Sequence, residues 1–217
     1  MTDQAFETMR QAMVASQLRT NAVSDPRVVA AMARVPRERF VAENRRSLAY
    51  VDIAVPLEGG RALCPPMVLG RLLTEAHPGP ADHALIVGAA TGYSAAVLGG
   101  LVASVVALEE DAALAVRARD LLAGEAGVTL VEGPLTQGWA ASAPYDLILI
   151  DGAVEQVPPA LVAQLAPRGR LAAAVVERGV TRLAVGRRAG GDFAMTAFAD
   201  AAAPILPGFE PVAGFRF

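Results

Sequence analysis

The residues with the clearest chemical potential lie between positions 84 and 109. An apolar run, 84–87, ends at Gly88 and enters a turn of small residues that closes at Gly92. A second apolar run, 104–108, is followed by Glu109. Glycines at a strand-to-helix turn let the backbone approach a ligand, and an acid at the end of the next strand can accept hydrogen bonds from ribose hydroxyls. This spacing predicts a nucleotide-type site.

Two cofactor classes compete for this turn. A dinucleotide fingerprint needs glycines at its first, third and sixth positions, where this chain has Gly88, Ala90 and Tyr93. S-adenosylmethionine carries no phosphate, so its site depends less on a phosphate-cradling turn and more on small residues against the backbone. The run Gly88-Ala89-Ala90-Thr91-Gly92 therefore favours S-adenosylmethionine.

Two acids are candidate ligand-binding groups. Glu109 is followed by Glu110 and Asp111, so one of these acids either binds ribose or caps a helix that starts near Ala112. We favour ribose binding for Glu109. Asp151 follows a second apolar strand and is expected at the carboxyl edge of the sheet, where open α/β folds bind ligands. It either acts near the cofactor or substrate or caps the segment that follows.

The composition excludes several classes of protein. A single cysteine excludes an internal disulfide, and with only two histidines we expect no metal site. All 19 basic residues are arginine, which excludes a Schiff-base lysine and a Walker-type phosphate loop. The net charge of −3 and the scattered arginines argue against a nucleic-acid partner.

Length and hydropathy indicate a compact chain. With 217 residues, 53% of them apolar, we expect one substantial core with a small appendage. The apolar runs are too short for a membrane span and the N-terminus is unlike a signal peptide, so we expect a cytoplasmic protein. No heptad pattern is present, and a monomer is the expected state.

The candidate ligand-binding residues between 84 and 151 need an α/β scaffold to position them. Amphipathic helices are expected at 6–18 and 25–35, the second capped by Ser24 or Asp25, and a third at 67–76. Apolar strands then alternate with helices, which predicts a mostly parallel sheet. We expect strands at 84–88, 104–108, 128–132, 146–151 and 170–176, helices at 111–125 and 159–165, and antiparallel edge strands at 181–187, 193–198 and 212–217. Residues 1–80 form an N-terminal helical and substrate-positioning part, and residues 81–217 form the core.

Two runs of the chain are distinctive in combination: Val35-Pro36-Arg37-Glu38-Arg39-Phe40-Val41 and Gly92-Tyr93-Ser94-Ala95-Ala96-Val97-Leu98. Shorter characteristic stretches occur at 13–14, 17–18, 49–52, 138–139, 144–146 and 164–165. Through these residues the chain resembles the protein-L-isoaspartate O-methyltransferase family over nearly its whole length. The resemblance implies a Rossmann-like class I methyltransferase fold with a mostly parallel, seven-stranded sheet and an antiparallel C-terminal edge.

The resemblance also implies a reaction. Members of the family transfer a methyl group from S-adenosylmethionine to the α-carboxylate of isoaspartyl residues in damaged proteins. Because a carboxylate is already ionised at neutral pH, this displacement needs no strong base. It needs both reactants held in line, with donors that position the anion.

The implied positioning segment departs from the family pattern. Where the family typically has Gln-Thr-Ile-Ser before a proline, this chain has Arg61-Ala62-Leu63-Cys64. Cys64 stands at the place of the active-site serine, and a thiol is a weaker donor than a hydroxyl. Cys64 is either a reactive group or, as we favour, a small filler. Arg61 either offers a charged fork to a carboxylate or lies on the surface. Arg61, Ala62 and Cys64 are the candidate catalytic residues.

The cofactor side departs as well. Ile86 stands where the family usually has an acid, and Ala90 stands where glycine would admit a ligand closely. Gly133-Pro134-Leu135 replaces the usual Gly-Asp-Gly, and Pro134 lacks a backbone donor. The candidate cofactor-binding residues are Gly88, Ala89, Ala90, Gly92, Glu109, Gly133, Pro134, Leu135 and Asp151. A second interpretation remains open, in which the chain keeps the fold but serves as a binding or scaffold protein, or methylates another substrate.

Overall fold

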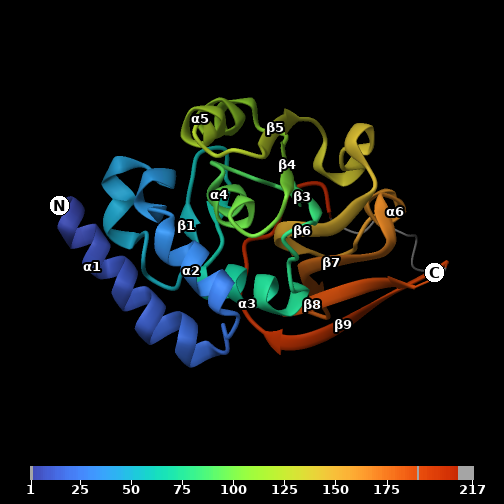
Figure 1. Ribbon diagram of the computed structural model, residues 1–217, viewed down its shortest axis with the longest axis horizontal. Coiled ribbons are helices and arrows are strands. Elements are labelled where there is room, and N and C mark those ends of the chain that lie inside the picture. The colour runs from blue at the N-terminus through green and yellow to red at the C-terminus, as the bar shows by residue number, and fades with distance from the viewer. Residues whose placement is uncertain (1, 190, 210–217) are drawn as a thin grey trace.

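The computed structural model describes residues 2–189 and 191–209, and a seven-stranded sheet lies at their centre (Figure 1). The strand order is β5-β4-β3-β6-β7-β8-β9. The strands β3 to β7 are parallel, whereas β8 and β9 pair antiparallel at one edge. The bounds are β3 His83–Val87, β4 Ser104–Glu109, β5 Val128–Glu132, β6 Tyr145–Val154, β7 Leu165–Glu177, β8 Val180–Ala189 and β9 Asp192–Asp200.

The central strands are apolar along their whole length because the sheet is covered on both faces. In β3, Ala84 and Ile86 enter one hydrophobic core, whereas Leu85 and Val87 enter the other. Successive side chains of a strand point to opposite faces, so a strand buried on both faces needs an unbroken apolar run. The strand order reverses between β3 and β6, which places a crevice at the carboxyl ends of these strands.

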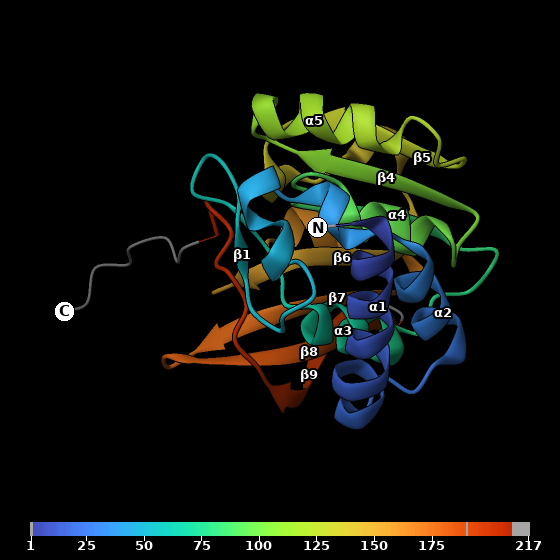
Figure 2. The ribbon, with the colours of Figure 1, turned by 90° about the vertical axis from the view of Figure 1, so that its left-hand side faces the viewer.

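Most helices pack on one face of the sheet. Figure 2 shows α1, α2 and α3 together on the side that carries the N-terminus. Residues of α1 to α5 join the larger core, whereas Leu161 of α6 joins the smaller one. The bounds are α1 Asp3–Met13, α2 Pro26–Arg34, α3 Pro66–Ala76, α4 Tyr93–Gly99, α5 Ala112–Leu122 and α6 Pro159–Ala163. Two short strands, β1 Val55–Pro56 and β2 Ala62–Leu63, pair antiparallel before α3.

The expected elements are present with adjusted ends. The first helix begins at Asp3, and its predicted last turn is a π-helix over Val14–Leu18. Asp25 caps α2, as one of the two predicted alternatives. The predicted edge strands 181–187 and 193–198 correspond to β8 and β9, whereas the predicted strand 212–217 lies outside the described residues.

One local motif decides where α5 starts. Asp111 is its N-cap, and the Asp111 Oδ1 atom accepts from the backbone N–H groups of Ala113 at 2.9 Å and Leu114 at 3.0 Å. Of the acids 109–111, the helix cap is therefore Asp111 and not Glu109.

Removing this cap should destabilise the fold. We expect Asp111→Ala to lower the free energy of unfolding by about 1 kcal/mol, since two N–H groups of the first turn lose their acceptor. Urea denaturation measures the change. The matched control is Asp120→Ala in the same helix, whose side chain is exposed and whose removal should change stability by less than about 0.5 kcal/mol. Equal effects of the two substitutions would contradict the capping role.

Candidate active site

The carboxyl ends of β3, β4 and β6 bring three predicted residues to one edge of the sheet. Gly88 follows β3, Glu109 ends β4, and Asp151 lies within β6. The connection between β1 and β2 supplies Arg61, and Cys64 follows β2. Figure 2 shows this connection close to the red segment that follows β9. Residues distant in the sequence therefore converge on the predicted crevice.

The turn after β3 has the backbone that the sequence predicts. Gly88 and Gly92 have φ values of +83° and +96°, which lie in the region that favours glycine. Ala90 also has a positive φ, +51°. An alanine in this conformation costs about 1 kcal/mol, so the turn follows a glycine-type path through a residue that is not glycine.

The carboxylate of Glu109 is the centre of the site. It is fully buried, with 0% of the residue exposed. Its Oε1 atom accepts from Arg61 Nη1 at 2.6 Å and from the backbone N–H groups of Glu110 and Asp111, each at 3.0 Å. Its Oε2 atom accepts from the backbone N–H of Ala90 at 2.6 Å. Both oxygens of the predicted ribose acceptor are thus bonded within the protein.

Of the two alternatives for Arg61, the structure contradicts the surface position, because Arg61 is only 6% exposed. The other alternative holds in part, since Arg61 offers its charge to a carboxylate. Its guanidinium is directed to the protein's own carboxylate at Glu109, and Nη2 also donates to the carbonyl of Gly88 at 3.3 Å. Breaking a buried ion pair of this kind by removing one partner costs about 3 to 5 kcal/mol, because the remaining charge is left buried.

Cys64 and Asp151 form a second buried group beside this ion pair. Burial raises the pKa of the Cys64 thiol well above its ordinary value, and the nearby Asp151 charge acts in the same direction. The thiol therefore stays protonated near neutral pH, which favours the filler interpretation over a nucleophile. Burial also raises the pKa of Asp151, while Ser94, Cys64, Arg37 and Arg61 oppose the rise. Asp151 is thus a buried acid and not an exposed helix cap.

Three of the remaining candidates on the cofactor side follow β5. Gly133 lies against the ring of Trp139, Pro134 is exposed and Leu135 is buried. None of the three carries a polar side chain. Ala89 and Ile86 are both fully buried, and Ile86 belongs to the larger core. Ala62 is half-buried in β2.

Two residues of this edge were absent from the sequence-based set. Leu206 is 2% exposed and lies over the crevice: an added Cβ at Gly88 would meet Leu206 Cδ1 at 3.0 Å, and one at Gly152 would meet Leu206 Cγ at 2.5 Å. Arg37 is 1% exposed, donates to the carbonyls of Ala49 and Cys64, and lies over the Tyr93 ring. The motif 35–41 contains Arg37, whereas nothing in the sequence around Leu206 indicates its position.

The two histidines differ in their surroundings. His77 is exposed, whereas His83 is half-buried. The His83 ring nitrogens lie 2.7 Å from Ser104 Oγ and 2.9 Å from the Ser142 carbonyl oxygen, and the ring stacks on Tyr145. The contact with Ser104 links β3 to β4, and the His83 ring does not line the crevice.

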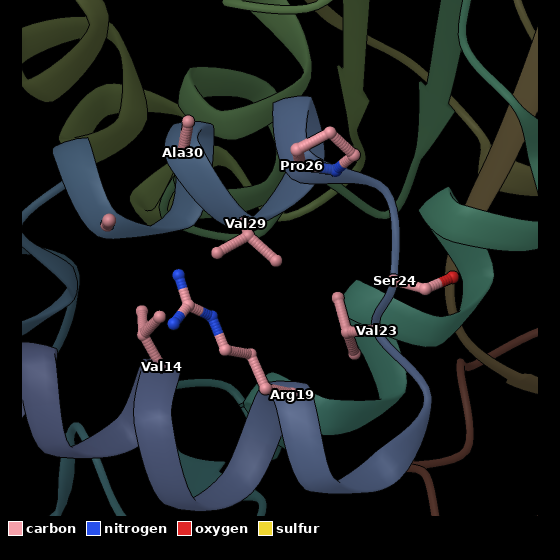
Figure 3. Close-up of a pocket in the computed structure, with 8 residues that line it drawn as sticks. Val14, Arg19, Val23, Ser24, Pro26, Val29 and Ala30 are labelled. Atoms are coloured by element: carbon pink, nitrogen blue, oxygen red, sulfur yellow. The ribbon is translucent and has the colours of Figure 1, made fainter.

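A distinct cavity lies far from these residues, between the first helix and α2. It has a volume of about 480 Å³ and an apolar lining that includes Val14 and Val29. Figure 3 shows the Arg19 guanidinium pointing into it, between these two side chains. The groups that carry the predicted chemistry therefore do not line this cavity.

The described residues also bear on metals and membranes. They contain no cluster of three or more His, Cys, Asp or Glu side chains placed to hold a metal ion. None of their helices combines the length and the apolar character that crossing a bilayer requires.

The strand order, the antiparallel edge and the crevice at the switch point define a Rossmann-like methyltransferase fold. A solved protein-L-isoaspartate O-methyltransferase superposes with a TM-score of 0.80 at 21% identity, covering 92% of this chain and 66% of that one. A Plasmodium falciparum protein assigned to the same enzyme, solved in complex with S-adenosyl-L-homocysteine, gives a TM-score of 0.78 at 17% identity and covers 91% and 97%.

Sequence comparison identifies the family. The model of protein-L-isoaspartate(D-aspartate) O-methyltransferases matches residues 8–202. The protein-L-isoaspartate O-methyltransferase of Koribacter versatilis is 39% identical over 197 residues, which are 90% of this chain and 89% of that protein. The chain belongs to the protein-L-isoaspartate(D-aspartate) O-methyltransferase family.

The buried acid makes stability depend on pH. A carboxyl whose pKa is raised in the folded state stabilises the fold when protonated, and this contribution is lost as the pH rises through the raised pKa. An asparagine at the same position does not titrate. We therefore expect the stability of Asp151→Asn relative to the parent chain to increase as the pH rises above the ordinary aspartate pKa of 3.8, and to level off once the pH exceeds the raised pKa.

Urea denaturation between pH 4 and pH 8 measures the difference. The exposed Asp120→Asn is the matched control, whose difference from the parent should stay flat. A relative stability of Asp151→Asn that falls with pH would show that the carboxylate is stabilised in its charged form.

Proposed function

We propose that this protein is an S-adenosylmethionine-dependent methyltransferase that acts on the α-carboxylate of isoaspartyl residues in proteins. The observation that carries the proposal is the family match over residues 8–202, together with 39% identity to a relative along nearly its whole length. The site supports it in one respect: Arg61, Cys64, Glu109 and Asp151 gather at the edge where folds of this class bind ligands.

The chemistry of this reaction suits a site without a nucleophile. The attacking group belongs to the substrate, and a carboxylate is ionised at neutral pH without help from a base. The protein has to hold the carboxylate in line with the methyl donor. A buried, protonated Cys64 is compatible with that task and with no covalent step.

The outer side of the positioning segment offers a place for a peptide. A hollow of about 460 Å³ there is mainly apolar and is lined in part by Ile53, Pro65, Met67 and Pro204. Ile53 is 42% exposed, so part of this apolar lining is open to solvent. We propose that the damaged protein segment lies here, next to Cys64.

Side chains of the protein itself occupy the crevice. Arg61 is bonded to Glu109 Oε1, and Arg61 and Leu206 lie over Gly88, whereas Glu109 Oε2 accepts one bond, from the Ala90 N–H. Pro134 supplies neither a carboxylate nor a backbone donor. S-adenosylmethionine therefore has to share the crevice with these side chains or displace them.

One observation favours a second candidate function. A relative that keeps the fold but has lost methyl transfer would serve as a protein-binding or scaffold protein, and the occupation of the crevice by Arg61 and Leu206 is the observation in its favour. For either function we propose a monomer in the cytoplasm. The net charge of −3 and the dispersed arginines argue against a nucleic-acid partner.

Methyl transfer separates the two candidates. Purified protein and radiolabelled S-adenosylmethionine should transfer label to a peptide that contains isoaspartate, and not to its twin that contains aspartate. The difference isolates the placement of the α-carboxylate, because the two peptides have the same composition and charge. Label on neither peptide, under conditions in which a known family member methylates the first, would favour the binding protein.

The missing hydroxyls should be limiting. We expect the double substitution Ala62→Thr with Cys64→Ser to raise the rate on the isoaspartyl peptide about tenfold, since a hydrogen bond to a charged group contributes about 1.5 kcal/mol. The matched control is Ala62→Val with Cys64→Ala, which changes volume similarly without adding a donor. Equal rates in both double variants would place the substrate carboxylate away from residues 61–64.

A further inference from the structure

We propose that Arg61 and Leu206 form an internal plug that competes with S-adenosylmethionine for the crevice, so that the cofactor binds only when both side chains leave it. The proposal rests on the proposed function, because it concerns the cofactor of that reaction. The plug consists of these two side chains only. They come from the connection before β2 and from the segment after β9, which approach each other at Gly88.

The Arg61 half of the plug replaces a ligand electrostatically. A buried carboxylate needs a cation or several donors, and Glu109 receives both from the protein itself. The guanidinium also satisfies the carbonyl of Gly88, which lies at the turn where the backbone would meet the cofactor. The folded chain thus meets the electrostatic demand of Glu109 without a bound molecule, and a ribose would have to displace Arg61.

The Leu206 half fills the space. Leu206 lies over two glycines, and Arg61 Nη2 would be 3.1 Å from a Cβ at Gly88 while Leu206 Cδ2 would be equally close. Leu206 approaches Gly152 more closely still, because its Cγ atom would be 2.5 Å from a Cβ built there, and the Pro204 carbonyl oxygen would be 3.0 Å from it. An apolar side chain and a guanidinium therefore share the space above the turn, and both are almost completely shielded from solvent.

The segment that carries Leu206 is joined to the sheet by few backbone bonds, so Leu206 is held mainly by its packing in the smaller core. The segment 201–209 pairs with β6 through one isolated bridge between Ala153 and Ile205. Ala153 N–H donates to the Pro204 carbonyl at 2.7 Å, and Leu206 N–H donates to the Ala153 carbonyl at 2.9 Å. Ile205, next to Leu206, is 58% exposed. Local opening of such a segment costs far less than global unfolding.

Calorimetric titration with S-adenosylhomocysteine tests the plug without requiring turnover. We expect Arg61→Gln and Leu206→Ala each to lower the dissociation constant about tenfold relative to the parent chain. If only a minor fraction of the molecules has an open crevice, the apparent affinity for the ligand is reduced by that fraction. Each variant should raise the open fraction. Gln retains a donor for Glu109, whereas Leu206→Ala keeps the ion pair intact and so tests the proposal even if Arg61→Gln fails to fold.

Two matched controls address the same residue types outside the crevice. Arg182→Gln removes an arginine that pairs with Glu177 on the exposed face of β8, and Ile205→Ala truncates the exposed neighbour of Leu206. Both should bind S-adenosylhomocysteine as the parent chain does. The quenching of Trp139, which lies against Gly133 at the same edge, provides an independent reading of each titration.

The outcomes separate the plug from the proposed function. Equal, tight binding in the parent and both plug variants, together with methyl transfer, overturns the plug and leaves the function standing. Tighter binding in the variants without transfer to the isoaspartyl peptide supports the plug and overturns the function. Absence of binding in all folded variants at millimolar ligand overturns both.

Discussion

A buried carboxylate must be neutralised or hydrogen-bonded, and Glu109 imposes this requirement on the centre of the molecule. Its position at the end of β4 follows from the sheet, since β4 pairs with β3 on one side and β5 on the other. Four donors converge on it: the Arg61 guanidinium and three backbone N–H groups. The conformation of the turn after β3 and the path of the connection before β2 are both adapted to this single group.

The consequence is a site that is complete without a ligand. In an open α/β fold the crevice at the switch point usually exposes unsatisfied groups that a ligand then satisfies. Here the Arg61 guanidinium pairs with the buried carboxylate, and the Leu206 side chain fills the space above the turn. A crevice occupied by Arg61 and Leu206 is compatible with family membership if the chain also adopts a second state in which the crevice is open. Ligand binding then depends on the difference in stability between the occupied and the open state.

Much of the fold could be predicted from local patterns. The apolar runs of β3, β4 and β6 are continuous because both faces are covered, and Pro26 after Asp25 marks the start of α2. These signals act over a few residues and survive without tertiary information. The end of the first helix, which becomes a π-helix, was predicted less well.

The sequence by itself determined the succession of the main strands and helices along the chain, the position of the Gly88–Gly92 turn and the absence of a hydroxyl at Ala62 and Cys64. These features depend on residue type and short spacing. Only the tertiary structure decided that Arg61 pairs with Glu109, 48 residues away, and that Leu206 packs over Gly88. Direction of a side chain and proximity across the chain arise from packing of the whole sheet, so no local pattern encodes them.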